Sequence, residues 1–144
     1  MSRYVFHSEW RLDADPDEVY RALRDVEHYP AWWPQVVGVR RIDDRSGELK
    51  IRSTLPYTLT VVLHREVEDA QRRVLRARLD GDMTGTSQWT VRAEGAGTLA
   101  VFDEDVDLRR RAIRAAGRFA RPALVLNHAH MMRAGEKGLK THLR

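Results

Sequence analysis

The chain has 144 residues, of which 42% are hydrophobic and 32% are charged, a composition typical of one globular domain and unlike that of a disordered segment. It contains no cysteine, which excludes disulfides, thiolate metal ligands and cysteine nucleophiles and fits a reducing compartment such as the cytoplasm. The chain does not open with a signal-peptide pattern, and no stretch approaches the roughly 18 apolar residues of a membrane span. We therefore expect residues 1–144 to form a single cytoplasmic domain with no membrane span.

The formal net charge of +4 is distributed unevenly. Residues 109–144 carry 10 Lys or Arg residues and one acid, whereas residues 1–108 carry 15 basic and 20 acidic residues. On a helix, four of the basic residues would share one face: Arg110, Arg114, Arg118 and Arg121. Such a stripe suits anionic lipid or nucleic acid. We favour a solvated face that balances the acidic body, because no nucleic-acid motif accompanies the stripe, and we expect no nucleic-acid partner.

The N-terminal part of the chain predicts one strand followed by two short helices. Apolar and polar residues alternate over residues 3–12, which is the period of a strand with one buried face. Asp15 precedes Pro16, so an N-cap and a first helical residue stand at the start of a short amphipathic helix. In the segment 29–34, prolines near both ends restrict the backbone, so we expect a single helical turn between two breaks.

From residue 35 the hydrophobic period becomes two, and six further strands follow. Their predicted ranges are 35–43, 48–55, 58–68, 73–80, 84–93 and 98–108. Consecutive strands joined by short turns form an antiparallel meander. The clearest alternation runs from Leu59 to Val67 and is interrupted by Arg65, so the sheet should have one apolar face.

After Leu108 the pattern becomes helical and continues to the end of the chain. Pro122 lacks a backbone N–H, so it should kink this helix or split it in two. The order of elements predicts an α+β domain in which a seven-stranded curved antiparallel sheet wraps around a long C-terminal helix. Because a curved sheet and a crossing helix leave space between them, the architecture favours an apolar pocket.

Four segments carry a resemblance to a known family: Asp15–Tyr20, Tyr29–Pro34, Gly81–Gly85, and Asn127–His128 together with Met131–Leu139. In this order they resemble the polyketide cyclase/dehydrase-like proteins of the START-like helix-grip superfamily (SRPBCC). The resemblance covers nearly the whole chain and implies a helix-grip fold whose deep apolar cavity binds lipids, polyketides or other hydrophobic molecules. Because the superfamily includes aromatase/cyclases, lyases and carriers, it leaves open whether this chain catalyses a reaction.

Glu104 and His128 are the candidate catalytic residues. Glu104 lies between Phe102 and Val106 in the last strand, so its carboxyl should point into the apolar interior. His128 lies on the C-terminal helix, where an imidazole can transfer a proton. Since this strand and helix should face each other, the pair could act as acid and base in a ring closure or a loss of water. The alternative is that both groups are structural, with Glu104 paired to an arginine.

Residues expected near the cavity, most of them aromatic, are the candidate ligand contacts, although core packing explains the tryptophans equally well. They are Trp32, Trp33, Tyr57, Trp89, Phe102, Asn127 and Met131.

Three carboxylates in the last strand invite a metal hypothesis. Asp103, Asp105 and Asp107 share one face, but the following residues do not fit a calcium-binding loop. We expect a solvated face paired with arginines. The six histidines have no zinc spacing, and no phosphate loop, nucleophile elbow or nucleotide fingerprint is present, so we expect neither metal nor cofactor.

Three functions stay open on this basis. The first is a domain, monomeric or homodimeric, that binds a small hydrophobic molecule. The second is an aromatase/cyclase or dehydratase that acts on such a molecule by cofactor-independent acid/base chemistry. The third is a basic module that contacts lipid or nucleic acid.

Overall fold

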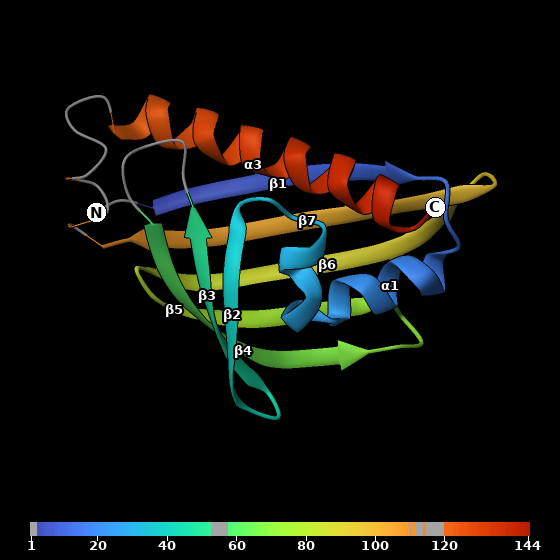
Figure 1. Cartoon of the computed structure of the whole chain (residues 1–144), viewed down its shortest axis with the longest axis horizontal. Helices are drawn as coiled ribbons and strands as arrows, with labels where there is room; N and C mark the ends of the chain where they lie inside the picture. Colours follow the sequence, from blue (N-terminus) through green and yellow to red (C-terminus); the bar gives the residue numbers. More distant parts are fainter. Residues whose placement is uncertain (1–2, 53–57, 110, 112–113, 115–119) are drawn as a thin grey trace.

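The computed structural model describes residues 3–52, 58–109, 111, 114 and 120–144. The strands are β1 (Arg3–Leu12), β2 (Val36–Asp43), β3 (Ser46–Arg52), β4 (Thr58–Asp69), β5 (Val74–Gly81), β6 (Met83–Glu94) and β7 (Gly97–Leu108), and the helices are α1 (Pro16–Arg24), the 3-10 helix η1 (Val26–Ala31) and α3 (Ala120–His142). The strands form one antiparallel sheet in the order β1-β7-β6-β5-β4-β3-β2. The predicted α+β fold is confirmed (Figure 1).

The first helix begins where its sequence predicts. The Asp15 carboxylate accepts the backbone N–H of Asp17 at 2.8 Å, and Pro16 occupies the first helical position, where its missing N–H is not needed. Val19, Tyr20 and Leu23 form the buried side of α1. This short helix therefore packs on the sheet by one face only.

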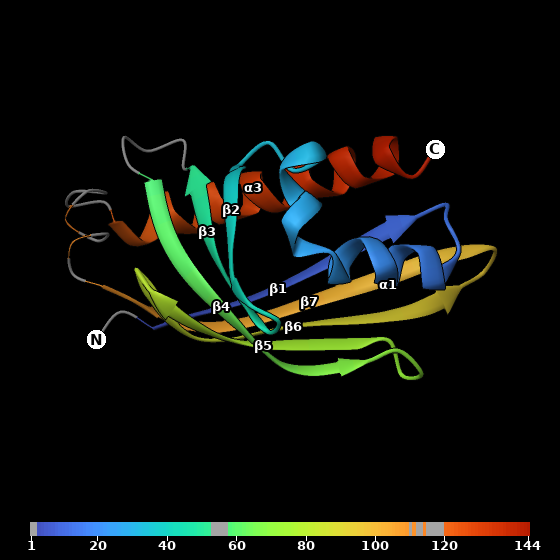
Figure 2. The ribbon, with the colours of Figure 1, turned by 60° about the horizontal axis from the view of Figure 1, so that its bottom comes forward.

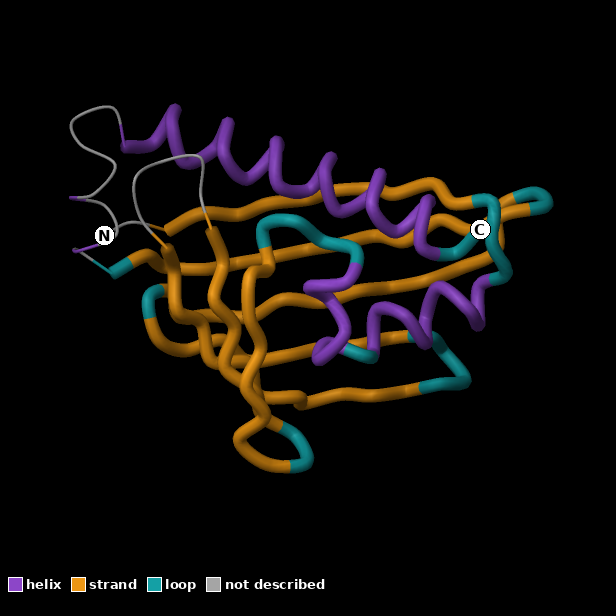
Figure 3. The backbone as a smooth tube through the Cα atoms, viewed as in Figure 1, coloured by secondary structure: helices purple, strands orange, loops and turns teal. Residues whose placement is uncertain are grey.

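The sheet is strongly curved, and α3 lies along its concave side (Figures 2 and 3). The described part of α3 begins at Ala120, two residues before Pro122, and residues 115–119 lie outside the described residues, so the kink or split expected at Pro122 stays a prediction. Gly135 faces the rings of Trp10 and Trp33, and Gly138 faces the backbone carbonyl of Trp32. Because glycine lacks a side chain, α3 can approach the turn after η1 this closely.

The buried core is divided into two clusters. The larger contains the four tryptophans, with Trp10 at its centre, 2% exposed, and its ring centroid lying 6.2, 5.2 and 4.7 Å from those of Trp32, Trp33 and Trp89. The smaller cluster lies toward the other end of the sheet and contains Tyr4, Val61, Ala77, Leu79, Val106 and Leu124. The candidate site lies where these two clusters meet α3.

The apolar face of β4 differs in one respect from its prediction. The pairing of β4 with β5 shifts register between Arg65 and Val67, so the alternation of inward and outward side chains breaks there. Val67, expected on the apolar face, is 37% exposed.

None of the helices in the described part of the chain is long and apolar enough to cross a membrane.

Candidate functional site

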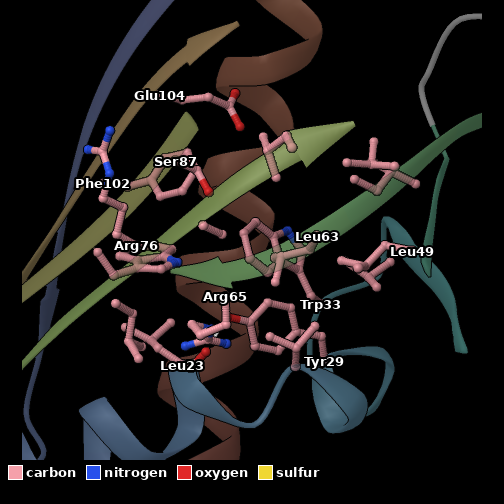
Figure 4. Close-up of a pocket in the computed structure, with 18 of the residues that line it drawn as sticks. Leu23, Tyr29, Trp33, Leu49, Leu63, Arg65, Arg76, Ser87, Phe102 and Glu104 are labelled. Carbon is pink, nitrogen blue, oxygen red and sulfur yellow. Dashed lines mark hydrogen bonds between the residues drawn. The ribbon is translucent and has the colours of Figure 1, made fainter. Parts of the chain in front are cut away.

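Two apolar cavities lie between α3 and the concave face of the sheet. The larger has a volume of about 90 Å³ and the smaller a volume of about 50 Å³. Figure 4 shows the larger cavity, with Tyr29 and Trp33 on one side and Phe102 on the other. Four residues line both cavities: Ile51, Met83, Glu104 and Met131. The cavities therefore form one region beneath α3, divided by these four residues.

Most of the expected ligand contacts lie around this region. Trp33, Trp89 and Phe102 line the larger cavity, Asn127 lines the smaller one, and Met131 lines both. Trp32 lines neither cavity, because it packs edge-on against Trp10 in the core and borders an outer groove between η1 and α3. Tyr57 lies outside the described residues.

Glu104 and His128 meet in the wall of the smaller cavity. Nε2 of His128 lies 3.3 Å from Oε1 of Glu104, and the two side chains are 12% and 7% exposed. The contact lacks hydrogen-bond geometry, so Nε2 has no hydrogen-bond partner among the residues that the structure describes. The imidazole stacks on Phe6, with ring centroids 3.7 Å apart and planes 7° apart. Among the described residues, the partner of Glu104 is His128 and not an arginine.

Glu104 also reaches the larger cavity, where the register of β6 and β7 places it opposite Ser87. A carboxyl group, an imidazole and a hydroxyl thus stand at the junction of the two cavities, in otherwise apolar surroundings. In such surroundings a carboxyl and an imidazole can exchange a proton with a bound molecule, provided that its reacting atom lies within hydrogen-bond distance.

Arg65 is a cavity residue that the sequence analysis did not single out. Its side chain lines the larger cavity and lies at the end opposite to Glu104 in Figure 4. Nη2 donates a hydrogen bond to the carbonyl of Arg24 at 3.3 Å, whereas the buried Nη1 has no partner among the described residues. A buried donor without an acceptor is costly, so this atom is suited to an acceptor on a ligand. The sequence signal was the interruption of an apolar alternation.

Tyr29 closes the cavity beside Arg65. Its hydroxyl donates a hydrogen bond to the carbonyl of Leu23, and burial raises the pKa of this phenol far above its ordinary value. The ring therefore stays neutral and serves as wall and anchor for η1 rather than as an acid or base. Arg76 also lines the cavity, but its guanidinium lies 3.5 Å from Glu66 and is already paired.

The three aspartates of β7 do not form a metal site. The structure contains no group of three His, Asp or Glu side chains suited to a metal within its described residues. Arg3 forms two hydrogen bonds with Asp105, which hold the pKa of that carboxyl below its ordinary value, as the expected pairing with arginine requires. Asp103 departs from this expectation, because its partner is His7 rather than an arginine, at 2.6 Å.

Some arginines of the basic segment, residues 109–121, have partners within the domain. Arg111 pairs with the buried Asp82, and the guanidinium of Arg121 lies 4.2 Å from the centre of the Tyr4 ring, so these two cations have partners within the domain. Arg114 is exposed, whereas Arg110 and Arg118 lie outside the described residues. Arg114 and Arg121 are both exposed, as a solvated face requires, and the expectation for the whole stripe stays a prediction.

Comparison with known proteins gives one family and one fold. Residues 5–144 match the family model described as polyketide cyclase/dehydrase and lipid transport. The Zhui aromatase/cyclase from Streptomyces sp. R1128 superposes with a TM-score of 0.82 at 18% identity, over 98% of this chain and 93% of that one. A START superfamily protein from Mycobacterium smegmatis superposes with a TM-score of 0.75 at 15% identity, over 96% of each chain.

The di-domain ARO/CYC BexL, from the BE-7585A biosynthetic pathway, is similar with a TM-score of 0.72 at 21% identity, over 99% of this chain and 50% of that one. No curated protein matches the chain in sequence. At these identities the solved structures show a shared helix-grip fold.

Proposed function

Because the chain belongs to the polyketide cyclase/dehydrase and lipid transport family, we propose that it binds a small hydrophobic molecule of polyketide, lipid or aromatic type between the sheet and α3. The observation that carries this proposal is the lining of the larger cavity. Its residues are mostly aliphatic and aromatic, and two of its few polar groups, Glu104 and Arg65, stand at opposite ends. Such a distribution binds an apolar body and orients it by its polar ends.

The cavities must widen to hold such a molecule. Volumes of about 90 and 50 Å³ are well below the roughly 300–1,000 Å³ of typical ligand sites. Met83 and Met131 stand in the partition between them, and methionine side chains adapt their shape at low cost. A ligand that displaces these two side chains joins the cavities and reaches both Arg65 and the Glu104–His128 pair.

Tryptophan fluorescence tests ligand binding directly, because Trp33 and Trp89 line the larger cavity. A titration with naphthyl ketones, polycyclic phenols and short acyl compounds should give a saturable change for at least one class. Ala77 lines the cavity and is buried, whereas Ala93 is exposed. Ala77→Leu should therefore weaken binding by at least about tenfold by filling the space, while Ala93→Leu should not. No response to any compound would sink the proposal.

A second candidate function is favoured by one observation, the contact between His128 and Glu104 in the cavity wall. We propose that, if the protein is an enzyme, this pair performs acid/base chemistry in a ring closure or a loss of water. His128 would accept a proton from the ligand at Nε2, the atom without a hydrogen-bond partner in the described structure, and pass it to Oε1 of Glu104, which would deliver it to the departing hydroxyl or to the carbonyl oxygen of the ligand. No cofactor is required for this chemistry.

The catalytic proposal is tested with a synthetic linear poly-β-ketone thioester as substrate. Glu104→Gln and His128→Ala should each lower the rate of cyclisation by at least about a hundredfold while changing its affinity little. Equal loss of affinity and rate in both variants would show that the pair serves binding or packing alone.

We further propose that the protein acts in a reducing compartment such as the cytoplasm, as a monomer or homodimer, with a small molecule rather than nucleic acid as its partner.

A further inference from the structure

A further hollow, distinct from the two apolar cavities, adjoins the larger of them on the side away from α3. This polar hollow, here called the vestibule, has a volume of about 180 Å³ and lies between the start of η1, the β2–β3 hairpin and β4. Its lining includes the charged residues Arg24, Glu27, Arg41, Arg45, Arg65 and Glu68. Most of these side chains are charged and exposed, so the vestibule is open to solvent.

The vestibule and the larger cavity share part of their lining. Val26, Leu49, Leu63 and Arg65 line both, so these four residues lie between the apolar interior and the polar hollow. Three of them are aliphatic, and the fourth presents its guanidinium to the partition. A ligand must pass between side chains to reach a buried cavity. This thin partition is therefore a suitable place for its entry.

Few bonds hold this partition closed. Arg65 is fixed to α1 by a single hydrogen bond of 3.3 Å to the carbonyl of Arg24, and its Nη1 has no partner among the described residues. Its position coincides with the register shift in β4, where the ladder is locally interrupted. Rotation of this one side chain therefore breaks one hydrogen bond and leaves the sheet intact.

A weak strap crosses the mouth of the vestibule. Glu27 on η1 lies 3.8 Å from Arg41 on β2, and their side chains are 57% and 55% exposed. It is the one ion pair between η1 and the hairpin in the described structure. The tip of the hairpin is held to β4 instead, because Arg45 donates to the carbonyl of Arg65 at 3.2 Å. Across the seam between η1 and the hairpin, by contrast, the one described ion pair is exposed and long.

From these observations we propose that the ligand enters and leaves the cavity through the vestibule, with the Arg65 side chain as the gate and the Glu27–Arg41 pair as its strap. This inference rests on the proposed function, because it presumes that the cavity binds a ligand. Glu27 and Arg41 line neither apolar cavity, so a change confined to this strap alters the rates of binding and release by the same factor and leaves the equilibrium constant unchanged.

The chain contains no cysteine, so two cysteines introduced at the strap would be the only thiols that a cross-linker can modify. In Glu27→Cys/Arg41→Cys, a bifunctional methanethiosulfonate of about the length of the ion pair locks the seam, and a reductant releases it. The probe is 6-propionyl-2-(dimethylamino)naphthalene, an uncharged naphthyl ketone. We expect cross-linking to slow its association and its dissociation by at least about tenfold each, with Kd unchanged within about twofold, and reduction to restore both rates.

The matched control is Arg3→Cys/Asp105→Cys, which replaces an ion pair on the outer face of β1 and β7. The same cross-link there should leave both rates unchanged. In the opposite direction, Arg41→Ala removes an exposed pair and should raise both rates by about two- to fivefold. Unchanged rates in the locked strap, or equal slowing in the control, would overturn the route. Failure of the unlocked protein to bind the naphthyl ketone or any other apolar compound would instead count against the proposed function.

Discussion

Gly135 of α3 faces two buried tryptophan rings, and its replacement by alanine should destabilise the protein. A Cβ at this position would lie 2.5 Å from Cε2 of Trp33 and 2.8 Å from Cη2 of Trp10. Ordinary carbon contacts are about 3.5 Å, so the rings or the helix must move by roughly 1 Å. The rings have little room, because Trp10 is 2% exposed and Trp33 donates its Nε1 hydrogen to the carbonyl of Met131.

Two opposing effects set the size of this change. Alanine is favoured over glycine in a helix interior by about 1 kcal/mol. Overpacking a dense core costs about 1–3 kcal/mol, and a strained hydrogen bond from Trp33 adds about 1 kcal/mol. The net expectation is a loss of about 2 kcal/mol. Gly138→Ala should cost more, because the obstacle there is the backbone carbonyl of Trp32.

Urea unfolding followed by tryptophan fluorescence measures this difference. With a denaturant slope of about 1–3 kcal/mol/M, the midpoint of Gly135→Ala should fall by about 1 M. Lys137→Ala, at an exposed site on the same helix, should stay within about 0.5 kcal/mol of the parent. A midpoint for Gly135→Ala at or above that of the parent would refute the close packing of α3 against the tryptophans.

Three further predictions concern the buried Asp82, the exposed His7 and the C-terminal segment 109–144. Asp82→Ala removes a buried acceptor of the Thr60 N–H and should cost about 1–3 kcal/mol in urea unfolding, whereas replacing its exposed partner Arg111 by Gln should cost under about 1 kcal/mol. Hydrogen bonds to two carboxylates raise the pKa of His7, so its stabilisation is present below the unfolded pKa and lost as pH rises through the folded pKa. His7→Gln should accordingly lower Tm at about pH 6 and not at about pH 9, and equal effects at both would contradict this. Deleting residues 109–144 should abolish cooperative unfolding, because the apolar face would be exposed, and a truncated chain that melts like the parent would contradict it.

The fold could be predicted because its signals are local. Alternation over residues 3–12 and from residue 35 onward gave the strands, and Asp15–Pro16 gave the start of α1. Short turns fix which neighbouring strands pair and in which register, so this pairing can be predicted without long-range information. The kink or split expected at Pro122 stays a prediction, because the residues just before Ala120 lie outside those that the structure describes.

The candidate site was predictable in part. The inward direction of Glu104 follows from the period of a strand, and its approach to His128 follows from a helix that crosses the sheet. Arg65 was missed because an arginine in an alternating strand resembles an ordinary interruption, although the period of two already places it on the same face as Val61 and Leu63, which also line the cavity. Trp32 and Trp33 are neighbours in sequence, yet only Trp33 lines the cavity. Distinguishing core from cavity requires the packing itself.

The central claim is that a hydrophobic molecule occupies the region between the sheet and α3. The most direct measurement uses ¹³C-labelled methionine methyl groups, of which the chain has four. Met83 and Met131 line both cavities, whereas Met132 is buried but lines neither, so it serves as an internal control. On titration with the naphthyl ketone, the account predicts saturable shifts of the Met83 and Met131 methyl signals with little change at Met132. Saturable binding that leaves the Met83 and Met131 signals unmoved would contradict it.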